Sequence, residues 1–202
     1  GFAGVYRTGD NDDTLHNCIF SPLDLHFAYV MQYAASFVGW SNTGKTQLIR
    51  RLTALLSARG HKVGTLKSGH SQPKFGASGK DTEVFFENGA ERVGFISPHG
   101  AFMRYRQAPP VEELLAQFAS CDIMLIEGSV SADIPCLELI KSAAHIDDSK
   151  FPPEHLAAYI SMSGDAADAV DAAGPSTLPI LPGRDPESIL QFLEELWNGK
   201  SL

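Results

Sequence analysis

Apolar runs alternate with amphipathic segments along the chain from residue 34 onward. Residues 34–38 and 123–126 are short, almost wholly apolar runs, a pattern typical of buried parallel strands. Leu48, Leu52 and Leu55 recur at helical spacing, and Gly60 is where we expect that helix to end. The same reasoning predicts strands at 62–66, 136–140, 156–160 (with helix left open) and 178–181, helices at 81–88, 111–119, 165–172 and 185–197, and a hairpin of 92–96 with 101–106. Alternating strands and helices indicate an α/β fold with a mainly parallel sheet flanked by helices.

The first 33 residues differ from the rest of the chain. They have no clear helical or strand period, apart from a short helix that residues 23–33 could form. We therefore divide the 202 residues into an N-terminal extension of unknown role, 1–33, and one domain, 34–202. No apolar run reaches the roughly 18 residues of a membrane span, and the nearest run lacks the basic flank of a secretory leader. We expect a cytoplasmic protein with no membrane partner.

The charge is unevenly distributed. The chain has a formal net charge of -8, yet residues 45–80 contain eight Lys and Arg and no Asp or Glu. Nucleic-acid binding needs a broad basic face, so we expect no nucleic-acid partner. One basic segment in an acidic chain favours a local site for a small polyanion. Arg50, Arg51 and Arg59 are better explained as the solvated face of a helix than as part of that site.

A glycine-rich segment joins the first predicted strand to the first predicted helix. Residues 39–46, GWSNTGKT, match the P-loop pattern GxxxxGK[ST] at every fixed position, which predicts a three-layer P-loop NTPase fold. The two glycines let backbone N–H groups turn inward around phosphate oxygens, and the helix N-terminus adds its positive end. In this pattern the lysine reaches the β- and γ-phosphates and the threonine hydroxyl ligates Mg²⁺. The predicted phosphate-binding residues are Gly39, Trp40, Ser41, Asn42, Thr43, Gly44, Lys45 and Thr46.

Two carboxylates are candidates for contact with the metal or the reacting water. Glu127 ends the apolar run at 123–126, where P-loop proteins hold the acidic partner of the metal, although a plain strand-end carboxylate remains an alternative. Asp122 begins that run, and we interpret it as structural. Asp81 begins a predicted helix and either caps it or approaches Mg²⁺ or the attacking water. We predict metal contacts from Thr46, Glu127 and Asp81, and catalytic roles for Lys45, Asp81 and Glu127.

Five stretches of the chain carry a family resemblance. In chain order they are FVGWSNTGKTQLIRRL, ARGHKVGTLKSGH, GKDTEVFFENGAERVGFIS, CDIMLIEG and LPILPGRDPESILQFL. Together they span about residues 34–195 and resemble the MobB family of molybdopterin-guanine dinucleotide biosynthesis. The resemblance implies GTP binding with Mg²⁺, weak hydrolysis, a homodimer, and an accessory role beside MobA, the guanylyltransferase that joins GMP to molybdenum-bearing molybdopterin.

The resemblance also assigns residues, and two segments depart from it. It makes Glu127 the strand-tip acid and Asp81 the loop acid. From its charge we interpret the basic loop with Lys67, His70 and Lys80 as facing a phosphate-bearing pterin, so molybdopterin is a further expected ligand, although a solvated loop position explains His70 better. The family's loop after the second strand is often rich in histidine, and a basic residue usually follows the strand tip. This chain has KSGH at 67–70 and SVSAD at 129–133.

Two other functions remain open from the residues alone. A P-loop small-molecule kinase or ligase would prefer ATP and turn over quickly. A metallochaperone GTPase would need clustered Cys and His, whereas His61, His70 and His99 are isolated. We expect a slow Mg²⁺-dependent GTPase that acts mainly as an adapter, because no arginine finger or water-positioning Gln is evident.

Base preference and dimerisation have the least direct support in the sequence. The guanine-reading pattern [NT]KxD is absent, so guanine preference rests on the resemblance. Residues 161–165, SMSGD, either contact the base or form a simple turn capped by Asp165. The homodimer rests on the resemblance, and the hairpin at 92–106, which offers unpaired strand edges, is a candidate docking edge for it.

Overall fold

The computed structural model describes residues 33–69, 81–163 and 178–199. The predicted helix at 165–172 lies outside these residues, as does the one at 23–33 apart from Tyr33. His70, Lys80 and Asp165 also lie outside them. No helix among the described residues combines the length and apolar character needed to cross a membrane.

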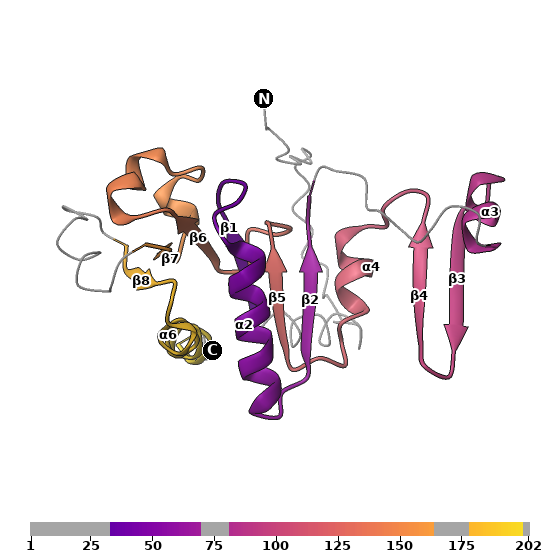
Figure 1. Ribbon diagram of the computed structural model, residues 1–202, viewed down its shortest axis with the longest axis horizontal. Coiled ribbons are helices and arrows are strands. Elements are labelled where there is room, and N and C mark those ends of the chain that lie inside the picture. The colour runs from indigo at the N-terminus through magenta and orange to yellow at the C-terminus, as the bar shows by residue number, and fades with distance from the viewer. Residues whose placement is uncertain (1–32, 70–80, 164–177, 200–202) are drawn as a thin grey trace, which may run out of the picture.

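Six parallel strands form the main sheet in the order β2-β5-β1-β6-β7-β8 (Figure 1). The chain first builds the sheet on one side of β1 and later on the other, which puts the carboxyl end of β1 at a topological switch point. Ligands of open α/β sheets bind at such points. The strands are β1 (Ala34–Val38), β2 (Val63–Lys67), β5 (Ile123–Glu127), β6 (Cys136–Ile140), β7 (Ala158–Ser161) and β8 (Ile180–Pro182).

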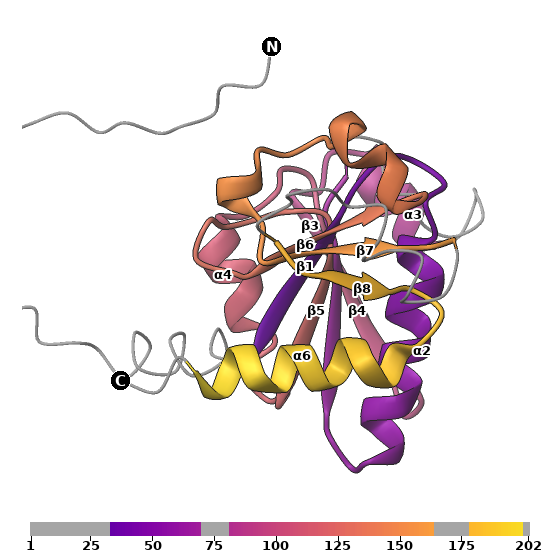
Figure 2. The ribbon, with the colours of Figure 1, turned by 90° about the vertical axis from the view of Figure 1, so that its left-hand side faces the viewer.

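Helices cover both faces of this sheet, which confirms the predicted three-layer fold (Figure 2). Side chains alternate between the faces of a strand. Leu125 therefore packs in the core shared with α2 (Lys45–Ala58) and α6 (Pro186–Asn198). Its neighbours Met124 and Ile126 pack on the opposite face, where α4 (Val111–Ala116) contributes Leu115. The 3-10 helices η1 (Ala143–Asp148) and η2 (Pro153–His155) follow β6, and Ile146 of η1 and Leu156 after η2 pack beside β6 and β7.

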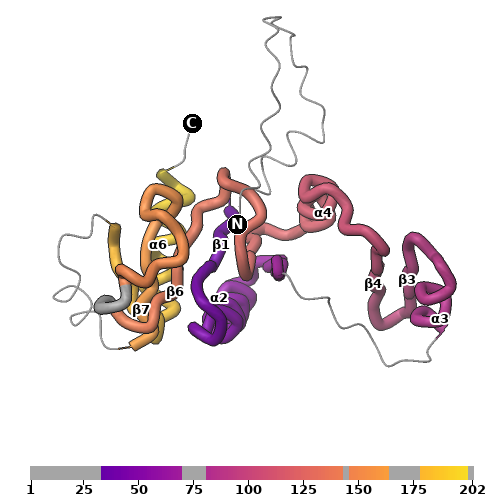
Figure 3. The backbone as a smooth tube through the Cα atoms, turned by 90° about the horizontal axis from the view of Figure 1, so that it is seen from above, coloured from indigo at the N-terminus to yellow at the C-terminus, as the bar shows by residue number. Residues whose placement is uncertain are grey.

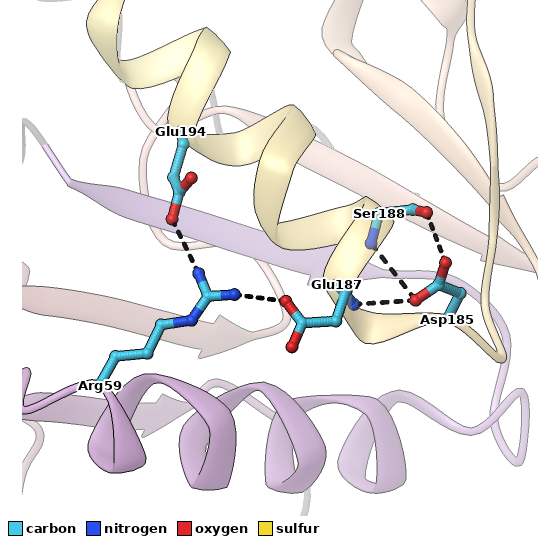
Figure 4. Close-up of polar contacts among 5 residues, drawn as sticks. All are labelled: Arg59, Asp185, Glu187, Ser188 and Glu194. Atoms are coloured by element: carbon cyan, nitrogen blue, oxygen red, sulfur yellow. Dashed lines mark hydrogen bonds and ion pairs between the residues drawn. The ribbon is translucent and has the colours of Figure 1, made fainter.

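One arginine ties α2 to α6 (Figure 4). Arg59 directly follows α2, and its guanidinium donates to the carboxylates of Glu187 and Glu194 on α6. Asp185 caps α6 by accepting hydrogen bonds from the backbone N–H groups of Glu187 and Ser188 and from the Ser188 hydroxyl. Arg59 was predicted to lie on a solvated helix face. Its side chain is half-exposed, and its ion pairs link the helix after the P-loop to the C-terminal helix.

A hairpin stands apart from the main sheet. It consists of β3 (Arg92–Ser97) and β4 (Gly100–Tyr105), which pair antiparallel, and α3 (Asp81–Glu87) contacts β3. Figures 1 and 3 show this unit beyond α4, at the opposite end of the molecule from β6, β7 and β8.

The predicted elements that fall within the described residues agree with the structure to within a few residues. Residues 156–160, for which a helix was left open, overlap strand β7 (Ala158–Ser161). The helix predicted at 111–119 ends at Ala116, because i→i−3 bonds such as Phe118 N–H to Leu115 O tighten the chain into turns after it. The 3-10 helices η1 and η2 were not predicted.

Candidate functional site

The glycine-rich segment forms a tight loop between β1 and α2. Gly39 and Gly44 have φ angles of 125° and 98°, and Asn42 has 64°, a conformation that Asn tolerates better than most residues. A Cβ on Gly39 would lie 2.5 Å from the carbonyl oxygen of Leu139 in β6, so glycine is required for the close approach as well as for φ. Glycines and Asn with positive φ are typical of loops whose N–H groups form an anion-binding concavity.

Lys45 folds back over this loop. Its ammonium donates to the carbonyl oxygens of Gly39 at 3.0 Å and Trp40 at 2.7 Å. Burial lowers the pKa of Lys45, the Glu127 carboxylate opposes that shift, and the positive charges of Lys150 and Lys67 lower the pKa further. The net effect is a pKa below the ordinary value, caused mainly by burial, and an anion bound at the loop would favour the charged ammonium.

Glu127 lies at the carboxyl end of β5, within hydrogen-bond reach of the P-loop helix. The Thr46 hydroxyl donates to its Oε2 at 2.7 Å, and the Lys67 ammonium donates to its Oε1 at 2.8 Å. Partial burial raises the pKa of the Glu127 carboxyl, but the hydrogen bonds from Lys67 and Thr46 and the charges of Lys67 and Lys45 outweigh it and hold the pKa below its usual value. Glu127 is therefore ionised at neutral pH beside Thr46.

Two of the predicted metal-binding residues are thus in contact with each other. A hydroxyl and a carboxylate oxygen are hard ligands that suit Mg²⁺, which in nucleotide sites takes one or two protein oxygens together with phosphate oxygens and water. The Thr46–Glu127 pair fits that requirement. Among the described residues, no group of three or more His, Cys, Asp or Glu is placed to hold a metal ion, so the cluster that a metallochaperone would need is not found there.

Asp81 is not brought to this pair. It begins α3, and Figures 1 and 3 show α3 at the far end of the molecule from β1 and α2. Asp81 forms no hydrogen bond or ion pair with the described residues of the P-loop or with Glu127. Its metal and catalytic roles stay predictions. Asp122, interpreted as structural, accepts a hydrogen bond from the backbone N–H of Lys62 at the opposite edge of the sheet, at 2.7 Å.

Lys67 is a contact that sequence reasoning did not assign. It was placed in a basic loop, whereas it is the last residue of β2 and pairs in register with Glu127, the last residue of β5. Neighbouring parallel strands end at the same edge, so the pairing follows from strand order. The strand order, however, is not written in any local pattern of the sequence.

Trp40 of the P-loop borders a cavity on the β6 side. Its side chain is 55% exposed, and its Nε1 donates to the carbonyl oxygen of Asp148 at 2.8 Å. The cavity has a volume of about 490 Å³. The residues that line it are Trp40, Ser41, Thr43, Leu139, Ile140, Lys141, Asp148 and Ser149. The segment with Asp148 and Ser149 follows no known motif, and sequence reasoning missed it.

Residues 161–165, for which base contact and a simple turn were both left open, lie partly within the described residues. Met162 follows β7, and a Cβ on Gly44 would lie 2.9 Å from the Met162 methyl carbon. The same side chain lies close to Gly183, after β8. Met162 therefore lies beside the P-loop on the β7 and β8 side, while Gly164 and Asp165 fall outside the described residues.

Comparisons with known proteins agree with one another. The family model for MobB, molybdopterin guanine dinucleotide synthesis protein B, matches residues 34–162. The chain is 27% identical over 168 residues to the molybdopterin-guanine dinucleotide biosynthesis adapter protein of Escherichia coli (strain K12), covering 79% of this chain and 90% of that protein. It is 30% identical over 114 residues to the probable adapter protein of Bacillus subtilis (strain 168), covering 54% and 66%. The crystal structure of Bacillus subtilis MobB superposes with a TM-score of 0.65 at 25% identity, covering 81% of this chain and 97% of that one.

Proposed function

The chain belongs to the MobB family of molybdopterin guanine dinucleotide synthesis, and from this premise we propose that it binds GTP with Mg²⁺ and assists a MobA-like guanylyltransferase as an adapter. The observation that carries the proposal is the contact between the P-loop and the strand-tip acid. Lys45 and Thr46 follow each other in the P-loop, Glu127 lies about 80 residues later in the chain, and the three meet at the carboxyl edge of the sheet.

The residues present suit a nucleoside triphosphate with its metal. On nucleotide binding, Lys45 exchanges its carbonyl partners for β- and γ-phosphate oxygens, which form stronger charge-assisted hydrogen bonds. Thr46 and Glu127 would hold Mg²⁺, directly or through water, and the metal would neutralise charge on the β- and γ-phosphates. Lys67 keeps Glu127 ionised and oriented. We expect hydrolysis to be slow, with Lys45 binding the γ-phosphate. A role for Asp81 in hydrolysis requires that a bound ligand or a second copy of the chain bring α3 closer to the P-loop.

Guanine preference is supported by the family rather than by a base-reading motif. The product of the relatives' pathway, molybdopterin-guanine dinucleotide, contains a guanine nucleotide. The adapter name of those relatives also supports a protein partner, for which a guanylyltransferase is the natural candidate, and molybdopterin as a ligand of the joint complex.

The hairpin supports a homodimer. Phe95 and Ile96 on β3 are 49% and 85% exposed, and Phe102 and Met103 on β4 are 47% and 54% exposed. Register pairs place Phe95 and Phe102 on one face of the hairpin and Ile96 and Met103 on the other, so both faces offer apolar surface. We propose that a second copy of the chain covers this surface in solution.

Association with the guanylyltransferase tests the adapter role. We would titrate a fluorescently labelled chain with purified MobA-like enzyme, with GTP and Mg²⁺ and without nucleotide, and follow anisotropy. Binding that GTP·Mg²⁺ strengthens in wild type but not in Lys45→Ala is the expected result. Lys62→Ala is the matched control, since Lys62 precedes β2 at the opposite edge of the sheet. If the two proteins do not associate under any condition, the adapter role is refuted. If they associate with the same affinity with and without GTP·Mg²⁺, the nucleotide's part in that role is refuted.

A further inference from the structure

A carboxylate is buried in the middle of the main sheet. Glu138, the third residue of β6, is 0% exposed and lies in register between Val38 of β1 and Tyr159 of β7. By strand alternation it shares a face with Cys136 and Ile140, which pack in an apolar cluster. A buried carboxylate is costly, so it persists only where several hydrogen bonds satisfy it.

One turn supplies those hydrogen bonds. The Ser149 hydroxyl donates to Glu138 Oε2 at 2.6 Å, the Lys150 backbone N–H donates to Oε1 at 2.8 Å, and the Phe151 N–H donates to Oε2 at 3.3 Å. Three donors from consecutive residues converge on one side chain. Glu138 therefore fixes the turn at 149–151, which follows η1.

The same turn contacts the P-loop. The residue just before it, Asp148, accepts the hydrogen bond from Trp40 Nε1, and the Lys150 ammonium lies 5.6 Å from the centroid of the Trp40 ring. Glu138 is thus connected to Trp40 through one short segment of backbone. A half-exposed indole held at both its N–H and its ring is a positioned surface rather than a mobile side chain.

The cavity beside Trp40 has the size and mixed lining of a ligand site. Its volume of about 490 Å³ lies within the range of roughly 300–1,000 Å³ for small-molecule pockets. Leu139 and Ile140 provide apolar surface, and Lys141 and Asp148 provide charge of both signs. An indole stacks well on flat heterocycles, an ammonium pairs with an anionic substituent, and a carboxylate accepts ring N–H groups.

We propose that this cavity binds a flat bicyclic heteroaromatic ring that carries an anionic group, and that Glu138 is the residue that positions its wall. A guanine nucleotide and a phosphorylated pterin share this chemistry, since both contain a 2-amino-4-oxopyrimidine ring. The choice of these two compounds rests on the proposed function, whereas the location of the ring follows from the cavity, Trp40 and Glu138. Trp40, Ser41 and Thr43 of the P-loop line the cavity, so it adjoins the predicted phosphate-binding loop.

Two fluorescent probes test the site. Pterin-6-carboxylate is titrated directly by anisotropy, and GMP is tested as a competitor and through a fluorescent GMP analogue. Wild type is expected to bind at least one probe, and Trp40→Ala and Glu138→Gln are expected to weaken that binding by at least tenfold. Lys62→Ala, far from the cavity, is expected to leave it unchanged. Pterin binding without competition by GMP identifies a second-ligand site, and GMP binding alone identifies a base site.

A second readout separates positioning from general loss of structure. Trp197 is 2% exposed, so the component of tryptophan emission that acrylamide quenches comes from Trp40. Glu138→Gln keeps the volume but supplies one acceptor oxygen and an N–H₂ group to a turn that offers three donors. In Glu138→Gln, acrylamide quenching of Trp40 emission is expected to rise while the far-UV circular dichroism stays native. Ser149→Ala, which removes one donor only, is expected to give an intermediate effect.

Several outcomes overturn the proposal. The proposal is wrong if neither probe binds to wild type, or if Trp40→Ala leaves probe binding unchanged. It is also wrong if Glu138→Gln is natively folded and leaves both probe binding and Trp40 quenching unchanged. If GTP binds in a Lys45-dependent manner but no ring binds at Trp40, this inference fails and the proposed function stands. If a ring binds at Trp40 but no GTP binding depends on Lys45, the proposed function fails and the cavity remains a ligand site.

Discussion

Replacing Gly39 by alanine measures how tightly the P-loop packs against β6. Gly39 has a φ of 125°, and an added Cβ would lie 2.5 Å from the carbonyl oxygen of Leu139 and 3.3 Å from its nitrogen. The backbone conformation alone costs an L-residue about 1–3 kcal/mol. The overlap with a strand backbone, which cannot move aside as a side chain would, adds about 1–3 kcal/mol. We expect a loss of about 2–6 kcal/mol, a large share of the roughly 5–15 kcal/mol of a typical domain.

Gly60 provides the matched control. It has a φ of 91°, and no heavy atom lies within 4 Å of a Cβ built there. Gly60→Ala therefore incurs conformational strain without the clash, about 1–2 kcal/mol. Urea denaturation followed by far-UV circular dichroism compares the two variants, and Gly39→Ala should lose about 1–3 kcal/mol more. Equal losses would refute the argument, because they would mean that the loop has room to move away from Leu139.

Three further predictions concern the helix cap, the helix clamp and the hairpin. Hydrogen bonds from the Ser188 hydroxyl and backbone hold the pKa of Asp185 below its ordinary value, so its charge stabilises the fold above the unfolded-state pKa of about 3.9. In urea titrations at pH 7, wild type should therefore be more stable than Asp185→Asn. That difference should vanish as the pH falls through the lower folded-state pKa. Arg59→Ala should cost about 0.5–1 kcal/mol in low salt and less in 1 M NaCl, since both of its ion pairs are half-exposed; an undiminished loss in high salt would contradict that origin. Ile96→Asp should convert a dimer to a monomer in multi-angle light scattering, with Ile96→Val as control; a dimer that persists would exclude the hairpin as the interface.

Local patterns predicted the P-loop half of the candidate site, and its phosphate-binding role stays a prediction. The GxxxxGK[ST] spacing, the apolar strand before it and the leucine stripe after it act over short sequence distances, so Lys45 and Thr46 could be assigned without knowing the fold. Glu127 could be assigned because an acid at the tip of an apolar run marks the carboxyl end of a buried strand. Its hydrogen bond to Thr46 agrees with that reasoning.

Long-range placement accounts for what the sequence left out. The pairing of Lys67 with Glu127 depends on β2 lying next to β5, although the two are separated by the hairpin and α4. The role of Glu138 depends on a turn that returns to β6 eleven to thirteen residues later. A single acid in an otherwise apolar strand was the available signal for it. Asp81 was assigned from its position before a predicted helix and from the family resemblance; α3, which it begins, packs on the hairpin, and its role stays a prediction.

Equilibrium binding of GTP and ATP, each with Mg²⁺, tests the central claim most directly. We would measure both affinities by titration calorimetry for wild type, Lys45→Ala and the control Lys62→Ala. Loss of charge-assisted hydrogen bonds worth about 1.5–3 kcal/mol predicts that Lys45→Ala weakens GTP binding by about 10- to 150-fold, with Lys62→Ala unchanged and ATP bound more weakly than GTP. Preference for ATP would point to a kinase or ligase instead. GTP binding that Lys45→Ala leaves intact would contradict the account of the site.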